Sequence, residues 1–174
     1  MLSRSVLFTL LLMVVAGCGG GNTEVGFTRA DGEAIRSILQ EFSETFGEND
    51  ASALIGDYSA NAMVLPPNSS TVRGPESIEG FFGTLFSEGK ASLVLEPGDL
   101  EADGTLGVIN GSYLLEIVPE GDSEGQRDRG KFVWVLRKLQ GRWYIQQQIW
   151  NSDLPPKVQR EPKSEPKEEK EEEE

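Results

Sequence analysis

Two carboxylates and two tyrosines are the side chains of this chain that could carry acid–base chemistry. Asp57 and Glu116 are the candidate general bases, because burial would raise the pKa of either carboxyl group towards neutrality. Tyr58 and Tyr113 could polarise a carbonyl group through their hydroxyls. Each residue also fits a structural role, since a carboxylate can lie on a solvated face and a tyrosine can pack in the core. The sequence leaves both interpretations open.

The chain contains no histidine, which excludes several classes of catalytic site. Acid–base catalysis by histidine, histidine metal ligands and Ser–His or Cys–His nucleophiles all require an imidazole. The sequence also has no metal-binding cluster and no glycine-rich phosphate loop, so it predicts neither a metal nor a cofactor. With a net charge of −13 it lacks the basic surface that nucleic acids require, and we expect no nucleic-acid partner.

Cys18, the only cysteine, follows a sequence typical of a secretion signal. A basic start, a mainly apolar run (Val6–Val15) and two small residues precede it. The pattern resembles a bacterial lipobox, which implies removal of residues 1–17 and acylation of Cys18. The mature protein would then be anchored through Cys18 in the cell envelope, on the outer membrane facing the periplasm in a Gram-negative cell. An ordinary signal peptide with a chance cysteine is the alternative.

The rest of the chain divides into a tether, one domain and a tail. Residues 18–27 place three glycines after the cysteine and predict a flexible tether. Residues 155–174 are rich in Pro, Lys and Glu and have almost no apolar side chains to offset the entropy of ordering, so they predict a disordered acidic tail. Residues 28–154 have the size of one domain, which can bury a core without disulfides.

The first part of this domain has the periodicity of helices. Thr28 begins a capping box, and apolar residues at helical spacing follow it. The predicted helices cover residues 28–47, 50–58 and 75–88. Between the second and third lies a short apolar run at 62–65, which prolines close and which we interpret as a brief or edge strand.

The second part changes to the pattern of strands. The predicted strands cover residues 91–95, 106–118, 131–139 and 142–151. Residues 119–128 are polar and contain glycine, so they predict a loop, with Arg127, Asp128 and Arg129 at its exposed end. Helices followed by an antiparallel meander indicate an α+β fold, in which a curved sheet packs on helices.

The alternation of side chains along the last strand suggests where a pocket could lie. With a period of two, Trp143, Ile145, Gln147 and Asn151 share one face. Trp143 and Ile145 fit a core position, so Gln147 and Asn151 are the predicted polar wall of a pocket further along that face. The alternative is that Gln147 lies near a solvated end of the sheet.

Several local strings occur in an order and spacing that resemble the nuclear transport factor 2-like superfamily, in its SnoaL-like and ketosteroid-isomerase-like branch. They are Phe42–Asp50, Ala53–Tyr58, Ala62–Pro67, Arg73–Ile78, Arg129–Phe132, Gly141–Ile145 and Ile149–Asp153. The resemblance implies a cone-shaped fold, in which a curved antiparallel sheet wraps around three N-terminal helices and a pocket opens at one end. It also implies a homodimer formed through the outer face of the sheet.

The resemblance leaves the function open, because members of this superfamily include isomerases, dehydratases, polyketide cyclases and binding modules. Ketosteroid isomerase pairs an aspartate base with a tyrosine, and Tyr58 matches a position where pockets of the family often have an aromatic or polar residue. Many relatives have histidine or aspartate in the segment that matches Gln147–Ile149, and aspartate at the position of Asn61. Glutamine forms hydrogen bonds but does not exchange protons near neutral pH.

We therefore expect a lipid-anchored extracytoplasmic domain that binds a small, largely apolar molecule or a partner without catalysis. Tyr58, Tyr113, Gln147 and Asn151 are its candidate binding residues. The alternative is an enzyme similar to ketosteroid isomerase or polyketide cyclase, an isomerase or dehydratase with a carboxylate base and a tyrosine.

Overall fold

The computed structural model describes residues 26–121 and 125–155. The predicted signal peptide, the predicted acylation site Cys18 and nearly all of the predicted tether and tail lie outside the described residues. Among the residues that are described, no helix is both long and apolar enough to span a membrane.

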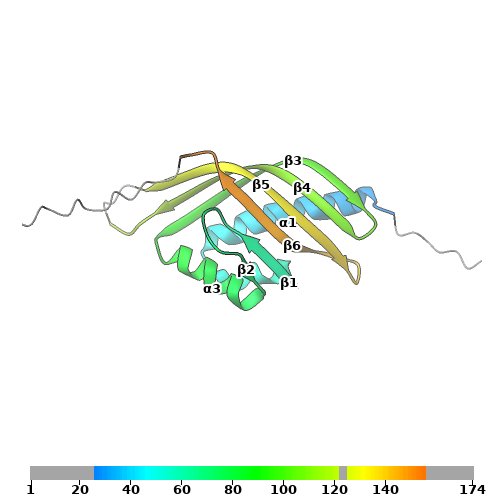
Figure 1. The fold of residues 1–174 in the computed structure, drawn as a ribbon, viewed down its shortest axis with the longest axis horizontal. Helices are drawn as coiled ribbons and strands as arrows, with labels where there is room; N and C mark the ends of the chain where they lie inside the picture. Colours follow the sequence, from blue (N-terminus) through cyan, green and yellow to red (C-terminus); the bar gives the residue numbers. More distant parts are fainter. Residues whose placement is uncertain (1–25, 122–124, 156–174) are drawn as a thin grey trace, which may run out of the picture.

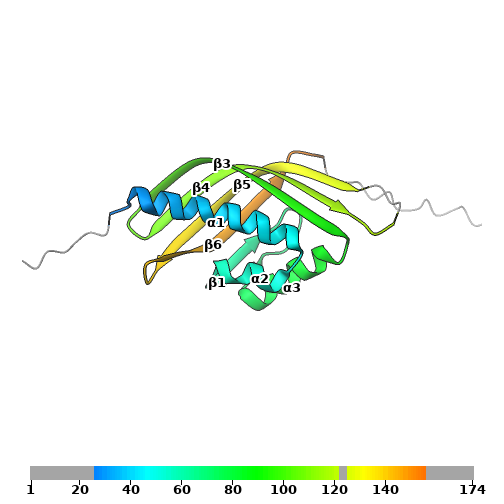
Figure 2. The same cartoon turned by 180° about the vertical axis from the view of Figure 1, so that it is seen from behind.

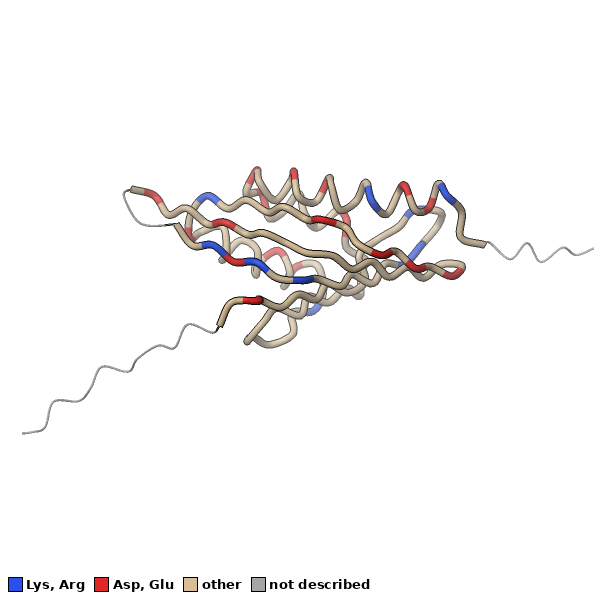
Figure 3. The backbone as a smooth tube through the Cα atoms, turned by 90° about the horizontal axis from the view of Figure 1, so that it is seen from above, with Lys and Arg blue, Asp and Glu red and all other residues tan. Residues whose placement is uncertain are grey.

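Three α-helices and a short 3₁₀ helix form one layer of the domain (Figure 1). They are α1 (Arg29–Glu48), α2 (Ala51–Leu54), η1 (Ile55–Asp57) and α3 (Pro75–Phe86). The capping box predicted at Thr28 is confirmed, because Thr28 Oγ1 accepts from Asp31 N at 3.2 Å and Asp31 Oδ2 accepts from Thr28 N at 3.0 Å. Most charged residues of α1 lie on the side turned away from the sheet (Figure 3).

Six strands form one curved sheet with the order β2-β1-β6-β5-β4-β3. They are β1 (Tyr58–Leu65), β2 (Val72–Arg73), β3 (Lys90–Asp103), β4 (Leu106–Val118), β5 (Gln126–Leu139) and β6 (Arg142–Ser152). β1 runs parallel to β6, and all other neighbours are antiparallel. Figure 2 shows α1 lying along the sheet, with α2 and α3 near one end. The predicted α+β fold with a curved sheet on three helices is confirmed.

Two strands begin earlier than the sequence indicated. β1 begins at Tyr58, directly after η1, instead of at residue 62. β5 begins at Gln126, so the prediction that residues 127–129 end a loop is wrong. Pairing with β4 explains the difference: Arg127 lies opposite Glu116, and its Nε is 2.7 Å from a carboxylate oxygen of that residue. Polar residues form a strand here because a neighbouring strand satisfies their backbone.

The core lies between α1 and the concave face of the sheet. The apolar stripe of α1 is buried from Ile35 to Phe46, and Trp134 on β5 has no exposed surface. The rings of Phe42 and Trp134 meet edge to face, with centroids 5.0 Å apart. Aromatic pairs of this geometry add to the free energy gained from apolar burial.

A buried carboxylate fastens the N-terminal end of α1 to the sheet. Asp31 Oδ1 accepts from Lys138 Nζ on β5 at 2.5 Å and from Trp143 Nε1 on β6 at 2.9 Å. Its other oxygen accepts from Thr28 Oγ1 at 2.7 Å. Hydrogen bonds from Lys138, Trp143 and Thr28 hold the pKa of Asp31 well below its usual value.

Asp31→Asn should lower the free energy of unfolding, and the effect should depend on pH. The folded-state pKa of Asp31 lies below the unfolded-state value of about 3.9. The stabilisation is therefore complete above that pH and is lost as the pH falls towards the folded-state pKa. Urea unfolding should show a difference in the free energy of unfolding between wild type and variant that is constant from about pH 7 to about pH 5 and narrows below about pH 4.

Glu33→Gln provides the control, because Glu33 lies on the same helix and its ion pair with Arg29 is exposed. This variant should unfold at nearly the wild-type urea concentration. If the difference in the free energy of unfolding between wild type and Asp31→Asn stayed constant with pH, the negative charge of Asp31 would not be what stabilises the fold.

Candidate functional site

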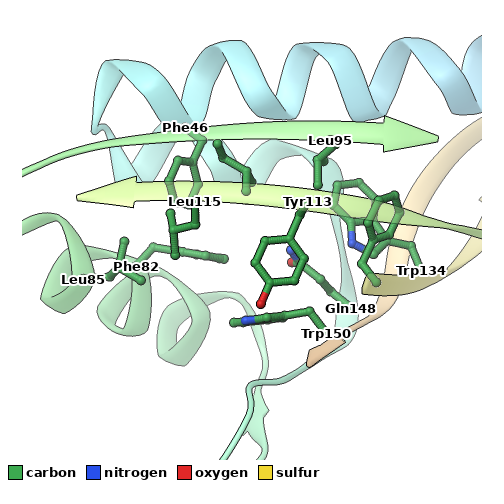
Figure 4. A pocket seen from close by; sticks show the side chains of 11 residues that line it. Phe46, Phe82, Leu85, Leu95, Tyr113, Leu115, Trp134, Gln148 and Trp150 are labelled. Atoms are coloured by element: carbon green, nitrogen blue, oxygen red, sulfur yellow. The ribbon is translucent and has the colours of Figure 1, made fainter. Parts of the chain in front are cut away.

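A small cavity lies between the concave face of the sheet and the helices α1 and α3, with a volume of about 40 Å³ (Figure 4). Its walls are mostly aromatic rings and leucines: Phe46, Phe82, Leu85, Leu93, Leu95, Tyr113, Leu115, Phe132, Trp134, Gln148 and Trp150. This lining contains no carboxylate and no amine. The cavity therefore favours an apolar group, with few positions for hydrogen bonds.

Gln148 is the buried polar group of the cavity, with 6% of its surface exposed. The hydroxyl of Tyr58, at the start of β1, donates a hydrogen bond to Gln148 Oε1 on the neighbouring strand β6. Burial, and then the negative charge of Asp57, raise the pKa of Tyr58 well above its usual value. Tyr58 thus stays neutral, and Gln148 Nε2 can still donate to a bound molecule.

A β-bulge in β6 decides which glutamine faces the cavity. Val135 pairs with Gln147, but the next residue of β5, Leu136, pairs with Ile145, so Gln146 has no partner opposite it. The extra residue reverses the alternation of faces. Gln148 therefore joins the buried side.

The prediction that Gln147 and Asn151 share the face of Trp143 and Ile145 is wrong for this reason. Beyond the bulge they point to the outer face of the sheet, and neither lines the cavity. A signal was present in the sequence: Trp150 is a large aromatic residue out of phase with Trp143, which is what a bulge between them would produce.

Tyr113 connects the cavity to a carboxylate that sequence reasoning assigned to a loop. Its hydroxyl donates to Asp128 Oδ2 at 2.8 Å, and Ser152 Oγ and the Arg129 backbone N–H donate to the other oxygen, the latter at 2.9 Å. Burial, followed by the hydrogen bond to Asp128, raises the pKa of Tyr113. Tyr113 is therefore a neutral donor at the cavity wall.

A glycine leaves room for the Tyr113 ring. Gly130 pairs with Tyr113 across β4 and β5, and a Cβ at this position would lie 2.9 Å from the ring and 2.0 Å from Asn151 O. Any larger residue would displace the ring or the backbone of β6. Figure 4 shows the Tyr113 side chain in the middle of the lining group.

The two candidate bases lie away from the cavity. Asp57 pairs with Arg142 at 3.2 Å beside the first turns of α1. Burial raises its pKa, while Arg142 opposes this shift. Glu116 points to the outer face of β4 and pairs with Arg127. Of the four candidates for acid–base chemistry, Tyr113 therefore lines the cavity and Tyr58 contacts it only through its hydrogen bond to Gln148. Asp57 and Glu116 do not line it.

Tyr58→Phe and Gln148→Leu should each lower the free energy of unfolding by about 1–3 kcal/mol, because each leaves a buried polar atom without its partner. The double variant should lose less than the sum of the two, by about 1 kcal/mol. Urea unfolding of all four proteins measures this coupling.

Gln147→Leu is the matched control for Gln148→Leu, since it alters the adjacent glutamine on the opposite face. Its effect should stay within about 0.5 kcal/mol. Additive losses in the double variant would show that Tyr58 and Gln148 do not stabilise one another.

Among the residues that the structure describes, no group of three or more acidic side chains is placed to hold a metal ion. The polar side chains at the cavity and beside it are Gln148, Tyr113 and Asp128.

Solved structures with the same arrangement of helices and strands establish the fold. One is a ketosteroid isomerase-like protein from Erwinia carotovora atroseptica (13% identity, TM-score 0.63, covering 77% of this chain and 99% of the other). Another is a predicted scytalone dehydratase from Novosphingobium aromaticivorans (11% identity, TM-score 0.67, covering 72% of this chain and 85% of the other). A third is a predicted calcium/calmodulin-dependent protein kinase II association domain from Xanthomonas campestris (16% identity, TM-score 0.62, covering 76% of this chain and 91% of the other).

No curated protein sequence matches the chain. A family model described as a SnoaL-like domain matches residues 35–149, from within α1 to within β6. The resemblance inferred from the sequence strings is thereby confirmed: the chain belongs to the SnoaL-like domain family.

Proposed function

We propose that this protein binds a small, largely apolar molecule in the cavity between the sheet and the helices, without catalysis. The composition of the cavity wall carries the proposal. Of its eleven side chains, only Tyr113, Gln148 and the two indole nitrogens are polar, and none of them exchanges protons near neutral pH. Binding sites for small molecules typically combine apolar walls with a few polar groups that orient the ligand.

The size of the cavity limits what enters it. A volume of about 40 Å³ gives room for about three water-sized groups. The apolar end of a ligand fits this space, and Gln148 Nε2 can donate a hydrogen bond to an acceptor on it. A groove lined by Asp128 and Ser152 adjoins the cavity, and Leu115 lines both. The remainder of a larger ligand would extend past Leu115 into this groove.

The enzymatic alternative has less support from the geometry. An isomerase or dehydratase needs a base beside the reacting carbon, and Asp57 and Glu116 do not line the cavity. Among the solved structures of this fold, the names of two refer to such activities, but identities of 11–13% carry the fold alone. Asp57→Asn and Glu116→Gln should therefore leave ligand binding unchanged.

Leu93→Trp should abolish binding, because Leu93 lines the cavity and a larger side chain there fills it. The measurement is native mass spectrometry of the purified protein, which detects a retained ligand by its added mass. Ser92→Trp is the control, since Ser92 is exposed on the other face of the same strand. A wild-type protein with no added mass, and no affinity for apolar probes, would contradict the proposal.

We propose further that acylated Cys18 holds the domain in the cell envelope. The support is the sequence before Cys18, with its basic start, apolar run and two small residues. Cys18 itself lies outside the described residues. Cys18→Ala should abolish incorporation of labelled fatty acid and leave the precursor uncleaved. Labelling that persists in this variant would assign the anchor to another residue.

The outer face of the sheet supports a homodimer as the assembled state. Several apolar side chains on it are exposed by 37–53%: Val94, Val108, Leu114, Val133 and Ile149. Exposed apolar groups of this kind mark interaction surfaces. Val133→Glu should convert the dimer to a monomer in sedimentation velocity, whereas Ala53→Glu on the exposed side of α2 should not.

A further inference from the structure

A carboxylate without a cationic partner lies beside Tyr113, in the groove that shares Leu115 with the cavity. We call this place the mouth of the cavity. Asp128 is half-buried on the concave side of β5 and accepts hydrogen bonds from Tyr113, Ser152 and the backbone of Arg129. Within residues 26–121 and 125–155, no Lys or Arg forms an ion pair with it. The three donors satisfy its oxygen atoms but leave its charge uncompensated.

The basic residues nearest in sequence do not supply that compensation. Side chains alternate between the faces of a strand, so Arg127, Arg129 and Lys131 point away from Asp128. Arg127 borders the groove beside Asp128, but its guanidinium pairs with Glu116. Lys131 pairs with Asp153, and Arg129 is exposed on the outer face.

Negative charge acts on the Tyr113 hydroxyl. Burial is the largest cause of the raised pKa of Tyr113, and the charges of Asp128 and Asp153 add to it. The net charge of −13 acts in the same direction over the whole molecule. An anionic group would therefore be repelled here, and a cationic one attracted.

Aromatic rings wall the cavity next to this carboxylate. Trp150 lines it together with Phe132 and Trp134, whose ring centroids are 5.7 Å apart. The faces of tryptophan and phenylalanine attract organic cations, most strongly where water is excluded. Aromatic walls beside an uncompensated carboxylate are the chemistry that recognises a protonated amine.

We propose that the ligand of this site is an apolar amine, whose protonated nitrogen lies beside Asp128 while its apolar part enters the aromatic cavity. The groove lined by Asp128, Ser152, Leu115 and Pro67 has a volume of about 330 Å³ and accommodates substituents on the nitrogen. The inference rests on the proposed binding function and adds the class of ligand.

Three probes of similar size and different charge test it, each with an apolar end of two or three carbons that fits the cavity: propylamine, 1-propanol and propionate. Isothermal titration calorimetry with the full chain measures their affinities. The amine should bind about tenfold or more tightly than the alcohol, and propionate most weakly. Asp128→Asn should reduce the affinity for the amine to that for the alcohol, and leave the alcohol unchanged.

Two further variants separate a local charge from the charge of the whole protein. Asp99→Asn removes one exposed carboxylate outside the site and should not alter the preference for the amine. Asp128→Glu keeps the charge and should retain the preference. In Asp128→Asn the amide oxygen can accept from Ser152 and the Arg129 N–H, while the amide nitrogen donates to the Tyr113 hydroxyl oxygen. In Asp128→Glu both oxygens remain acceptors, so each variant can keep position 128 hydrogen-bonded to its neighbours.

The possible failures are distinguishable. Equal affinities for amine and alcohol, with both lost in Leu93→Trp, would overturn the ligand class and leave the binding function intact. An equal loss of the amine preference in Asp99→Asn and Asp128→Asn would assign it to net charge and overturn the site. If Asp128→Asn weakened both ligands equally, Asp128 would act by positioning Tyr113. If no probe bound, the binding function itself would fail.

Discussion

Helix α1 is held against the sheet at both ends by side-chain hydrogen bonds, and the cavity depends on this placement. At its N-terminal end, buried Asp31 accepts from Lys138 and Trp143 on β5 and β6. At its C-terminal end, the Asn49 carboxamide donates to Ala91 O and accepts from Ala91 N on β3, both at 2.9 Å. Such bonds are strong where water is excluded. Between them, the apolar stripe of the helix forms one side of the core.

The curvature of the sheet provides the other side, and glycines permit it at two places. A Cβ on Gly111 would lie 2.7 Å from the Phe132 ring, and one on Gly130 would lie 2.9 Å from the Tyr113 ring. Each aromatic ring therefore lies across a glycine on the neighbouring strand. This packing lets bulky side chains lie flat on a concave surface, which leaves a small cavity where the rings meet Gln148.

The separation of polar groups supports the proposed recognition of a ligand without reaction. Carboxylates with nearby cations lie outside the cavity, as Asp57 does beside Arg142 and Glu116 beside Arg127. The cavity itself contains neutral donors and acceptors that hold their protons at neutral pH. Asp128 differs from both groups: it is a carboxylate at the mouth of the cavity, and it accepts hydrogen bonds but has no cation beside it. A site of this kind can discriminate between ligands by charge without taking a proton from them.

The sequence by itself determined the α+β class, the order of the elements and the lack of imidazole chemistry, because periodicity, capping at Thr28 and composition are local properties. It could not determine which glutamine faces the cavity, or that Asp128 meets Tyr113. One unpaired residue, Gln146, reverses the faces of β6, and pairing with β4 turns a polar loop into a strand. Both outcomes depend on hydrogen bonds between segments far apart in the chain, so only the tertiary structure decided them.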